Sequence, residues 1–340
     1  SFTLHQGETL GVVGESGCGK STLARAVLRL IEPTHGSVSW LGTNLTSLDK
    51  KNMIKARQNL QIVFQDPLAS LDPRMTISTS IAEPLRTFRP DLTAQERRTE
   101  VEDMMHRVGL DASMYNRYPH ELSGGQNQRV GIARAMINRP KLIICDEAVS
   151  ALDVSIQAQI IKLLKDLQSE FGMSMLFISH NLGLVLETCD RICVMYSGEA
   201  VERGDIKTVF EEMRHPYTQA LFRSIPVPGA DKNARPLKAI PGNFPLPHER
   251  PQGCNFGPRC DYFVKGRCDA AEVPMFDVDG QKLHESRCFR HGEIDWKAPM
   301  EAMATKEKGK IGEVVLKIDN LKKYYEVAAN ALFGGGDKKV

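Results

Sequence analysis

The sequence predicts an α/β fold in which a largely parallel sheet carries a phosphate-binding loop. Three observations predict it. Short apolar runs alternate with helix-like segments from Glu8 to about Ser224, as is typical of buried parallel strands. A glycine-rich loop follows the first of these runs, and the composition shifts to proline, glycine and polar residues after Pro226. Such a shift marks a domain boundary. We therefore expect about two domains, which also suits 340 residues at about 100–200 residues per domain.

Composition narrows the class of protein further. The 44 lysines and arginines nearly balance the 42 aspartates and glutamates, leaving a net charge of +2, so nucleic acid is not an expected partner. The sequence contains no apolar run near the ~18 residues of a membrane-spanning helix. Ser1–Glu8 lacks the features of a signal peptide. We therefore expect a cytosolic protein, in which the eight cysteines do not form a disulfide scaffold.

The α/β core follows from one apolar run after another. The first predicted strand is Thr9–Val13, and the first predicted helix is Ser21–Leu30. Further strands are predicted at Leu60–Phe64, Leu142–Cys145, Met175–Ile178 and Ile192–Met195. Residues from about 76 to 139 contain no comparable run, and Thr93 and Glu96 form a capping box that opens a helix. A helical subdomain is therefore predicted to interrupt the core.

The glycine-rich loop carries the most specific signal. Gly14–Ser21 reads G-x-x-x-x-G-K-S between a strand and a helix, the context that identifies a P-loop. Its backbone N–H groups and the helix N-terminus favour phosphate. Lys20 is predicted to reach the β- and γ-phosphates, and Ser21 to hold Mg²⁺. A chance glycine-rich turn is the alternative. The predicted nucleotide-binding residues here are Gly14, Glu15, Ser16, Gly17, Cys18, Gly19, Lys20, Ser21 and Thr22.

Two acidic residues end another predicted strand. Asp146 and Glu147 follow Leu142–Cys145. Beside a P-loop, Asp146 is predicted to bind Mg²⁺, and Glu147 to polarise the attacking water as general base. The alternative is an ordinary strand that ends in solvated acids.

A further motif, Leu122-Ser-Gly-Gly-Gln126, resembles the signature of the ATP-binding-cassette (ABC) ATPases when taken with the two elements above. The resemblance covers residues 8 to about 203 and implies a P-loop NTPase fold of the ABC type. It also implies that two domains enclose two ATP molecules head to tail, each between one P-loop and the partner's Ser123–Gln126. A simple helix-capping role for Ser123 is compatible with this. The residues that the resemblance adds are Gln65, Ser123, Gly124, Gly125, Gln126, Asp153 and His180.

Each added residue has an implied role. Gln65 joins the shell of the metal and the attacking water, and His180 senses the γ-phosphate. Asp153 ends the Ser150–Asp153 turn and works across the dimer interface. One departure is visible, because Ala148 stands where the family usually has proline after the catalytic glutamate. We expect the change to affect rate rather than identity, since proline would stiffen the turn.

Several stretches resemble the oligopeptide and dipeptide importer ATPases of bacteria, from residue 1 to about 290. This resemblance implies an ATP-hydrolysing subunit that pairs with a sister ABC ATPase beneath two transmembrane permease subunits. It also implies an extracytoplasmic peptide-binding protein, and a peripheral position on the cytoplasmic face of the bacterial inner membrane. The stretches are Phe64–Met75, Ile81–Leu85, Arg117–His120, Ile156–Gln159, His215–Thr218 and the cysteine-bearing segment.

Other functions remain open beside this one. A soluble ABC ATPase of a non-transport complex, such as carbon–phosphorus lyase, is one alternative, and an importer of nickel or another small solute is a second. A DNA-repair cassette is disfavoured, because Gln65 and Leu122 are too close for a long coiled-coil insertion. An iron–sulfur sensor with a vestigial ATPase is disfavoured by intact Lys20, Asp146, Glu147 and His180.

Four cysteines crowd the loop-rich segment. Cys254, Cys260, Cys268 and Cys288 give the spacing C-x5-C-x7-C-x19-C. Four thiolates suit zinc or a [4Fe–4S] cluster, although zinc sites favour closer pairs; free thiols are the third alternative. Resemblance to importer ATPases with this pattern implies the [4Fe–4S] cluster. We therefore expect the four sulfurs to converge.

The two ends of the chain suggest its domain limits. We expect an ABC ATPase domain over 1–225 with its helical subdomain at about 76–139, a cysteine module over 226–296 and a linker over 297–312. Residues 313–340 resemble the opening segment of a cassette, which residues 1–225 lack. Either a tandem fusion or a permuted chain would explain this. If the tail is ordered, Val314–Ile318 is expected to pair beside Ser1–Leu4, with Tyr325 near the P-loop.

Overall fold

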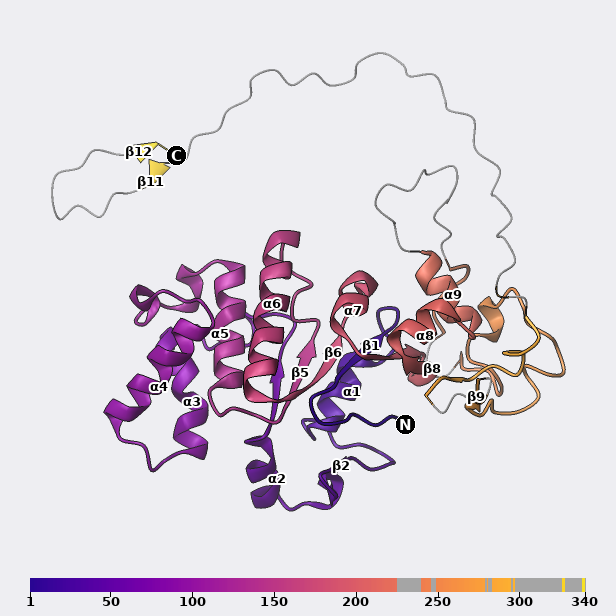
Figure 1. Cartoon of the computed structure of the whole chain (residues 1–340), viewed down its shortest axis with the longest axis horizontal. Coiled ribbons are helices and arrows are strands. Elements are labelled where there is room, and N and C mark those ends of the chain that lie inside the picture. Colours follow the sequence, from indigo (N-terminus) through magenta and orange to yellow (C-terminus); the bar gives the residue numbers. More distant parts are fainter. Residues whose placement is uncertain are drawn as a thin grey trace, which may run out of the picture. The chain divides into compact units, whose positions relative to one another are not determined.

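A computed structural model of the chain describes residues 1–224, 240–245, 249–278, 280, 283–294, 296, 326–327 and 338–339. These residues belong to two units, Ser1–Met300 and Glu301–Val340. In the second unit, β11 (Glu326–Val327) pairs antiparallel with β12 (Lys338–Lys339) (Figure 1). The predicted strand Val314–Ile318 and Tyr325 lie outside the described residues, so the pairing proposed for them stays a prediction.

The first unit is built on an eight-stranded mixed sheet with the order β4-β5-β6-β1-β7-β8-β10-β9. The first five strands of this order, β4, β5, β6, β1 and β7, run parallel to one another. The remaining pairings are antiparallel. Every predicted strand of the α/β core is therefore present. The strands are β1 (Thr9–Val13), β4 (Leu60–Val63), β5 (Leu142–Asp146), β6 (Ser174–Ile178), β7 (Arg191–Tyr196), β8 (Glu199–Asp205), β9 (Phe276–Asp277) and β10 (Glu285–Ser286). A separate small hairpin joins β2 (Ser39–Trp40) to β3 (Thr43–Asn44).

Helices cover the parallel part of the sheet, and Figure 1 shows α1, α6 and α7 beside β1, β5 and β6. They are α1 (Lys20–Val27), α2 (Lys50–Arg57), α6 (Val154–Phe171) and α7 (Leu182–Thr188). Two further helices, α8 (Ile206–Glu211) and α9 (Pro216–Arg223), pack against the antiparallel strand β8. The expected helical subdomain is also present, with α3 (Ile77–Phe88), α4 (Ala94–Arg107) and α5 (Gly124–Met136) grouped together (Figure 1). The capping box of Thr93 and Glu96 opens α4, as predicted.

The central strands are buried on both faces because their side chains alternate between two apolar cores. Ile143 and Cys145 of β5 belong to the larger core, which reaches into the helical subdomain, whereas Leu142 and Ile144 belong to the core around α1. This rigid centre fixes the strand ends at which the candidate site lies.

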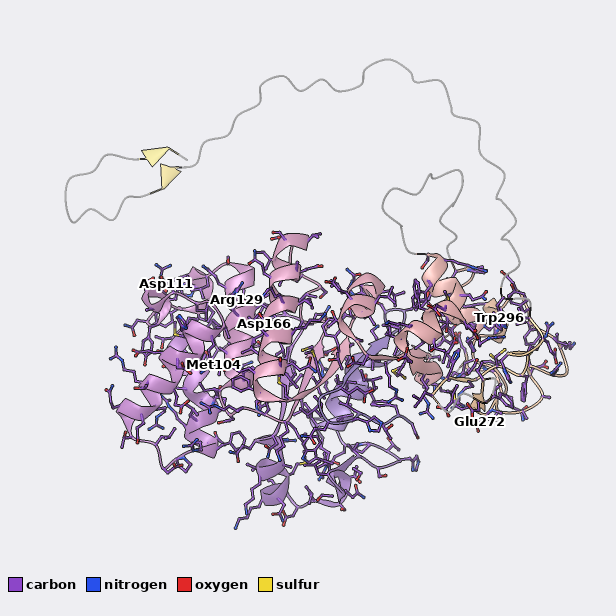
Figure 2. All side chains as sticks on the ribbon, viewed as in Figure 1. Met104, Asp111, Arg129, Asp166, Glu272 and Trp296 are labelled. Atoms are coloured by element: carbon purple, nitrogen blue, oxygen red, sulfur yellow. The ribbon has the colours of Figure 1, made fainter. Side chains whose placement is uncertain are left out.

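The cysteine-bearing segment does not stand apart from the core sheet. Its strand β10 pairs with β8, and β9 pairs with β10, so both extend the sheet. Arg203 of β8 and Glu285 of β10 form an ion pair across this junction. Figure 2 places Glu272 and Trp296 in this part of the unit, away from Met104 and Asp111 of the helical subdomain.

Candidate functional site

The P-loop connects β1 to α1 and is shaped by two of its glycines. A Cβ on Gly14 would lie 2.2 Å from the carbonyl oxygen of Met195 on β7, so the loop can pass this strand only with glycine there. Gly19 has a φ of 102°, a left-handed conformation that costs a non-glycine residue energy. Ser16, Gly17 and Thr22 are exposed, whereas Cys18 is buried. The loop thus offers an accessible backbone at the start of a helix, the arrangement that binds phosphate.

The side chain of Lys20 folds back onto this loop. Its Nζ donates to the carbonyl oxygens of Gly14 at 2.8 Å and Glu15 at 3.2 Å, and the side chain is only 5% exposed. The Glu147 carboxylate lies nearby, with its Oε1 3.9 Å from the Lys20 Nζ. Buried charges are normally paired, and this carboxylate and the two carbonyl oxygens hold the positive charge of Lys20 at the loop.

Ser21 and Asp146 meet at the base of the loop. The Ser21 Oγ donates to the Asp146 Oδ1 at 2.8 Å. Burial raises the pKa of Asp146, against the opposing effect of this hydrogen bond. Paired hydroxyl and carboxylate oxygens are the ligands that Mg²⁺ prefers, and a bound cation would favour the ionised carboxylate. The donor set therefore fits the metal.

The three predicted catalytic side chains converge at the ends of three neighbouring strands. Gln65 follows β4, Glu147 follows β5, and His180 lies just beyond β6. The Glu147 Oε2 accepts from Gln65 Nε2 at 2.9 Å and lies 3.3 Å from His180 Nδ1. Glu147 is 12% exposed in its side chain, and its φ of 49° is unusual for a non-glycine residue. Such strain persists where surrounding structure enforces it, often at functional sites.

The Ser123–Gln126 segment lies at the N-terminus of α5. Ser123 Oγ accepts from the Gln126 N–H at 3.3 Å, and the Gln126 side chain accepts from the Ser123 N–H at 2.9 Å. A Cβ on Gly125 would lie 2.9 Å from Ile156 at the start of α6, the helix that Asp153 caps by accepting from the Ile156 N–H at 3.0 Å. Within the described part of the chain, no hydrogen bond or ion pair joins this segment to the P-loop.

The surroundings of Glu15 could not be predicted from the sequence. The Arg259 guanidinium binds the Glu15 carboxylate through two hydrogen bonds of 2.8 and 3.1 Å. Tyr217 Oη accepts from the Glu15 backbone N–H at 2.8 Å. The motifs around Arg259 and Tyr217 are visible in the sequence, but no sequence signal joins them to a P-loop about 200 residues or more away.

The four clustered cysteines line one cavity, together with Phe256, Tyr262 and neighbouring residues. They form no disulfide, and burial raises the pKa of both Cys260 and Cys288 to about 12. In the part of the chain that is described, no group of three or more His, Cys, Asp or Glu side chains is arranged to hold a metal ion. The cysteines thus share a cavity without a preformed metal geometry. A membrane-spanning helix is also not found among the described residues.

Comparison with known proteins identifies the class. Residues 1–150 match the family described as ABC transporter. The chain is similar to the dimeric post-hydrolysis structure of the ATP-binding cassette MJ0796 bound to ADP and Pi. That match has a TM-score of 0.56 and 31% identity, covering 60% of this chain and 88% of that one. CbiO1 from Clostridium perfringens matches with a TM-score of 0.56 and 29% identity, over 62% of this chain and 82% of that one. The fold is therefore that of an ABC ATPase.

Closer relatives identify the family within that class. Residues 201–268 match the family described as oligopeptide/dipeptide transporter, C-terminal region. The oligopeptide transport ATP-binding protein OppF of Salmonella typhimurium is 54% identical over 291 residues, 85% of this chain and 86% of that protein. The di/tripeptide transport ATP-binding protein DppF of Pseudomonas aeruginosa is 47% identical over 290 residues, 85% of this chain and 89% of that protein. The chain belongs to the oligopeptide and dipeptide transport ATP-binding proteins.

Proposed function

We propose that this chain is the ATP-hydrolysing, energy-coupling subunit of an ABC importer for peptides. The observation that carries the proposal is the convergence of Gln65, Glu147 and His180 at one place. Lys20 and the Ser21–Asp146 pair lie beside them. The chain is also 54% identical to an oligopeptide transport ATP-binding protein. These residues occupy the carboxyl ends of adjacent parallel strands, where open α/β sheets bind ligands.

In this mechanism the P-loop backbone and Lys20 bind the triphosphate. Ser21 and Asp146 would hold Mg²⁺, which when bound would supply positive charge to the phosphates. Glu147 accepts the proton of the attacking water as general base. The hydrogen bond from Gln65 and the nearby His180 orient the same carboxylate. His180 is 56% exposed in its side chain, so it is also free to contact a γ-phosphate that enters from solvent.

The head-to-tail dimer is part of the proposal. Ser123–Gln126 is a capped helix N-terminus of α5 that has no bond to its own P-loop in the described residues. The N-terminus of a helix attracts anions, so this segment is suited to the γ-phosphate bound by a sister ATPase. Asp153, which caps α6 close to Gly125, would act at the same interface.

The remaining partners follow from the family. We propose that the dimer works beneath two transmembrane permease subunits, peripherally at the cytoplasmic face of the bacterial inner membrane. An extracytoplasmic peptide-binding protein would supply the peptide. The test is uptake by the assembled transporter in proteoliposomes, with a labelled oligopeptide and labelled nickel offered separately. ATP-dependent accumulation of the peptide is expected, whereas accumulation of nickel alone would contradict the assignment of the substrate.

We also propose that Cys254, Cys260, Cys268 and Cys288 hold a [4Fe–4S] cluster. Their common cavity and their free thiols support it. When bound, the cluster would cross-link a loop-rich segment. The chain's thiols would have to deprotonate and close in around it, because burial raises the pKa of Cys260 and Cys288. Anaerobically purified protein should contain about four iron and four sulfide ions per chain. Metal-free protein whose thermal stability is unchanged by Cys260→Ser would refute the cluster.

A further inference from the structure

The ion pair between Glu15 and Arg259 joins the P-loop to the cysteine-bearing segment. Both guanidinium Nη atoms donate to the Glu15 carboxylate, at 2.8 and 3.1 Å. The Arg259 side chain is 6% exposed, and its Nε donates to the carbonyl oxygen of Pro241 at 2.8 Å. A planar guanidinium that binds a carboxylate through two bonds sets orientation as well as distance. The position of Glu15 is therefore determined by Arg259.

Glu15 is held from two further sides. Its backbone N–H donates to Tyr217 Oη at 2.8 Å, and its carbonyl oxygen accepts from Lys20 Nζ at 3.2 Å. The same Lys20 ammonium is predicted to bind the nucleotide phosphates. The backbone of Glu15 therefore connects Arg259 directly to the main cation of the P-loop.

The charge of Glu15 gives Arg259 a second effect. A carboxylate in the P-loop would repel the triphosphate, and a buried arginine bound to it compensates the charge. Without Arg259, the loop would lose an anchor and gain an uncompensated anion at once. Both changes weaken nucleotide binding.

Arg259 is itself placed by the cysteine-bearing segment. It ends the 3-10 turn η5 (Gly257–Arg259), which lies between Cys254 and Cys260. The turn is closed by hydrogen bonds from the Gly257 N–H to the Cys254 carbonyl at 2.8 Å and from the Cys260 N–H to the Gly257 carbonyl at 3.1 Å. Movement of the cysteine backbone would therefore reach Glu15 through a single short turn.

We propose that Arg259 is a positioning residue for ATP binding, through which the cysteine-bearing segment holds the P-loop ready for the nucleotide. The proposal rests on the nucleotide site described under "Proposed function". It concerns affinity rather than the chemical step, because no hydrogen bond or ion pair in the described residues joins Arg259 to Asp146, at the end of β5, or to Glu147, which follows that strand. Pre-ordering a binding loop improves affinity, since the ordering cost is met before the ligand arrives.

The experiment measures MgATP affinity by calorimetry on the full chain, with thermal unfolding as a check of folding. Arg259→Met should weaken binding about tenfold, equivalent to ~1.4 kcal/mol, and Arg259→Lys should fall between it and the wild type. The rate of hydrolysis at saturating ATP should change less than about twofold, since only ground-state binding is altered. Arg203→Met is the matched control, because the Arg203–Glu285 pair also joins the segment to the core but lies on β8 and β10. It should leave ATP affinity unchanged.

A double-mutant cycle isolates the pair itself. Glu15→Gln combined with Arg259→Met should bind ATP no more weakly than Arg259→Met alone, because both substitutions break the same contact. Full additivity of the two losses would overturn the proposal, as would wild-type affinity in Arg259→Met or an equal loss in Arg203→Met. If Arg259→Met fails to fold, the cycle uses Arg259→Lys instead. Lys20→Ala tests the nucleotide site separately from the role of Arg259, because unchanged ATP binding in that variant would refute the nucleotide site itself.

Discussion

Substitution of Lys20 by methionine tests the charge at the centre of the P-loop while keeping most of its buried stem. The change removes two hydrogen bonds, to Gly14 and Glu15, and the charge that lies 3.9 Å from Glu147. At that separation and an effective dielectric constant of about 20, the bare Coulomb attraction is about 4 kcal/mol, which desolvation largely offsets.

The effect on nucleotide binding should be larger than the effect on the P-loop itself. A charge-assisted hydrogen bond contributes about 1.5–3 kcal/mol, so loss of one phosphate contact should weaken MgATP binding roughly 10- to 150-fold. Calorimetric titration of the full chain measures this. Lys165→Met is the control, because the Lys165 Nζ also donates to a backbone carbonyl, that of Glu187 at 2.7 Å, in a different part of the fold. Equal affinities of Lys20→Met and the wild type would refute the reasoning.

Two further outcomes follow from the fold. Burial lowers the pKa of His215 to about 3, so the unfolded state binds one more proton between pH 3 and about 6.5, and stability should fall by up to ~1.4 kcal/mol per unit as pH decreases through that window. In urea unfolding, His215→Asn should make the free energy of unfolding depend less on pH in this window. An unchanged pH dependence would mean that groups other than His215 cause it. Thr93→Ala should lower the unfolding free energy by about 1 kcal/mol, because it removes the cap of α4. Thr99→Ala in the same helix should cost less, and an equal loss in thermal unfolding would contradict the capping argument.

The parallel strands could be predicted because their residues are buried on both faces. β5 and β6 are apolar along almost their whole length, and short continuous apolar runs between helices are typical of strands in a parallel sheet. β8 could not be predicted in the same way, because Glu199–Asp205 is largely polar and only its neighbours stabilise it as a strand. The carboxylate of Glu202, fully buried in β8, accepts from the backbone N–H of His215 at 3.0 Å and lies 2.8 Å from His284 Nε2. Those partners are distant in the sequence.

The candidate site likewise contains residues that could be predicted from the sequence and residues that could not. Lys20, Asp146 and Glu147 could be predicted because each directly follows a recognisable strand or loop, and the strand order brings them together. The Glu15–Arg259 pair could not, because only the packing of the cysteine-bearing segment on the sheet brings these two residues into contact. The expected pairing of Val314–Ile318 beside Ser1–Leu4 remains a prediction, and Ser1–Leu4 forms no strand in the structure.

The most direct test of the central claim is Glu147→Gln in the assembled transporter. The amide keeps the size of the side chain that faces Gln65 and His180 but cannot accept the proton of the attacking water. MgATP should still bind, hydrolysis should fall about 10²- to 10⁴-fold, and the two ATPase subunits should remain locked together in the ATP-bound state. Hydrolysis by Glu147→Gln at near the wild-type rate would contradict the account.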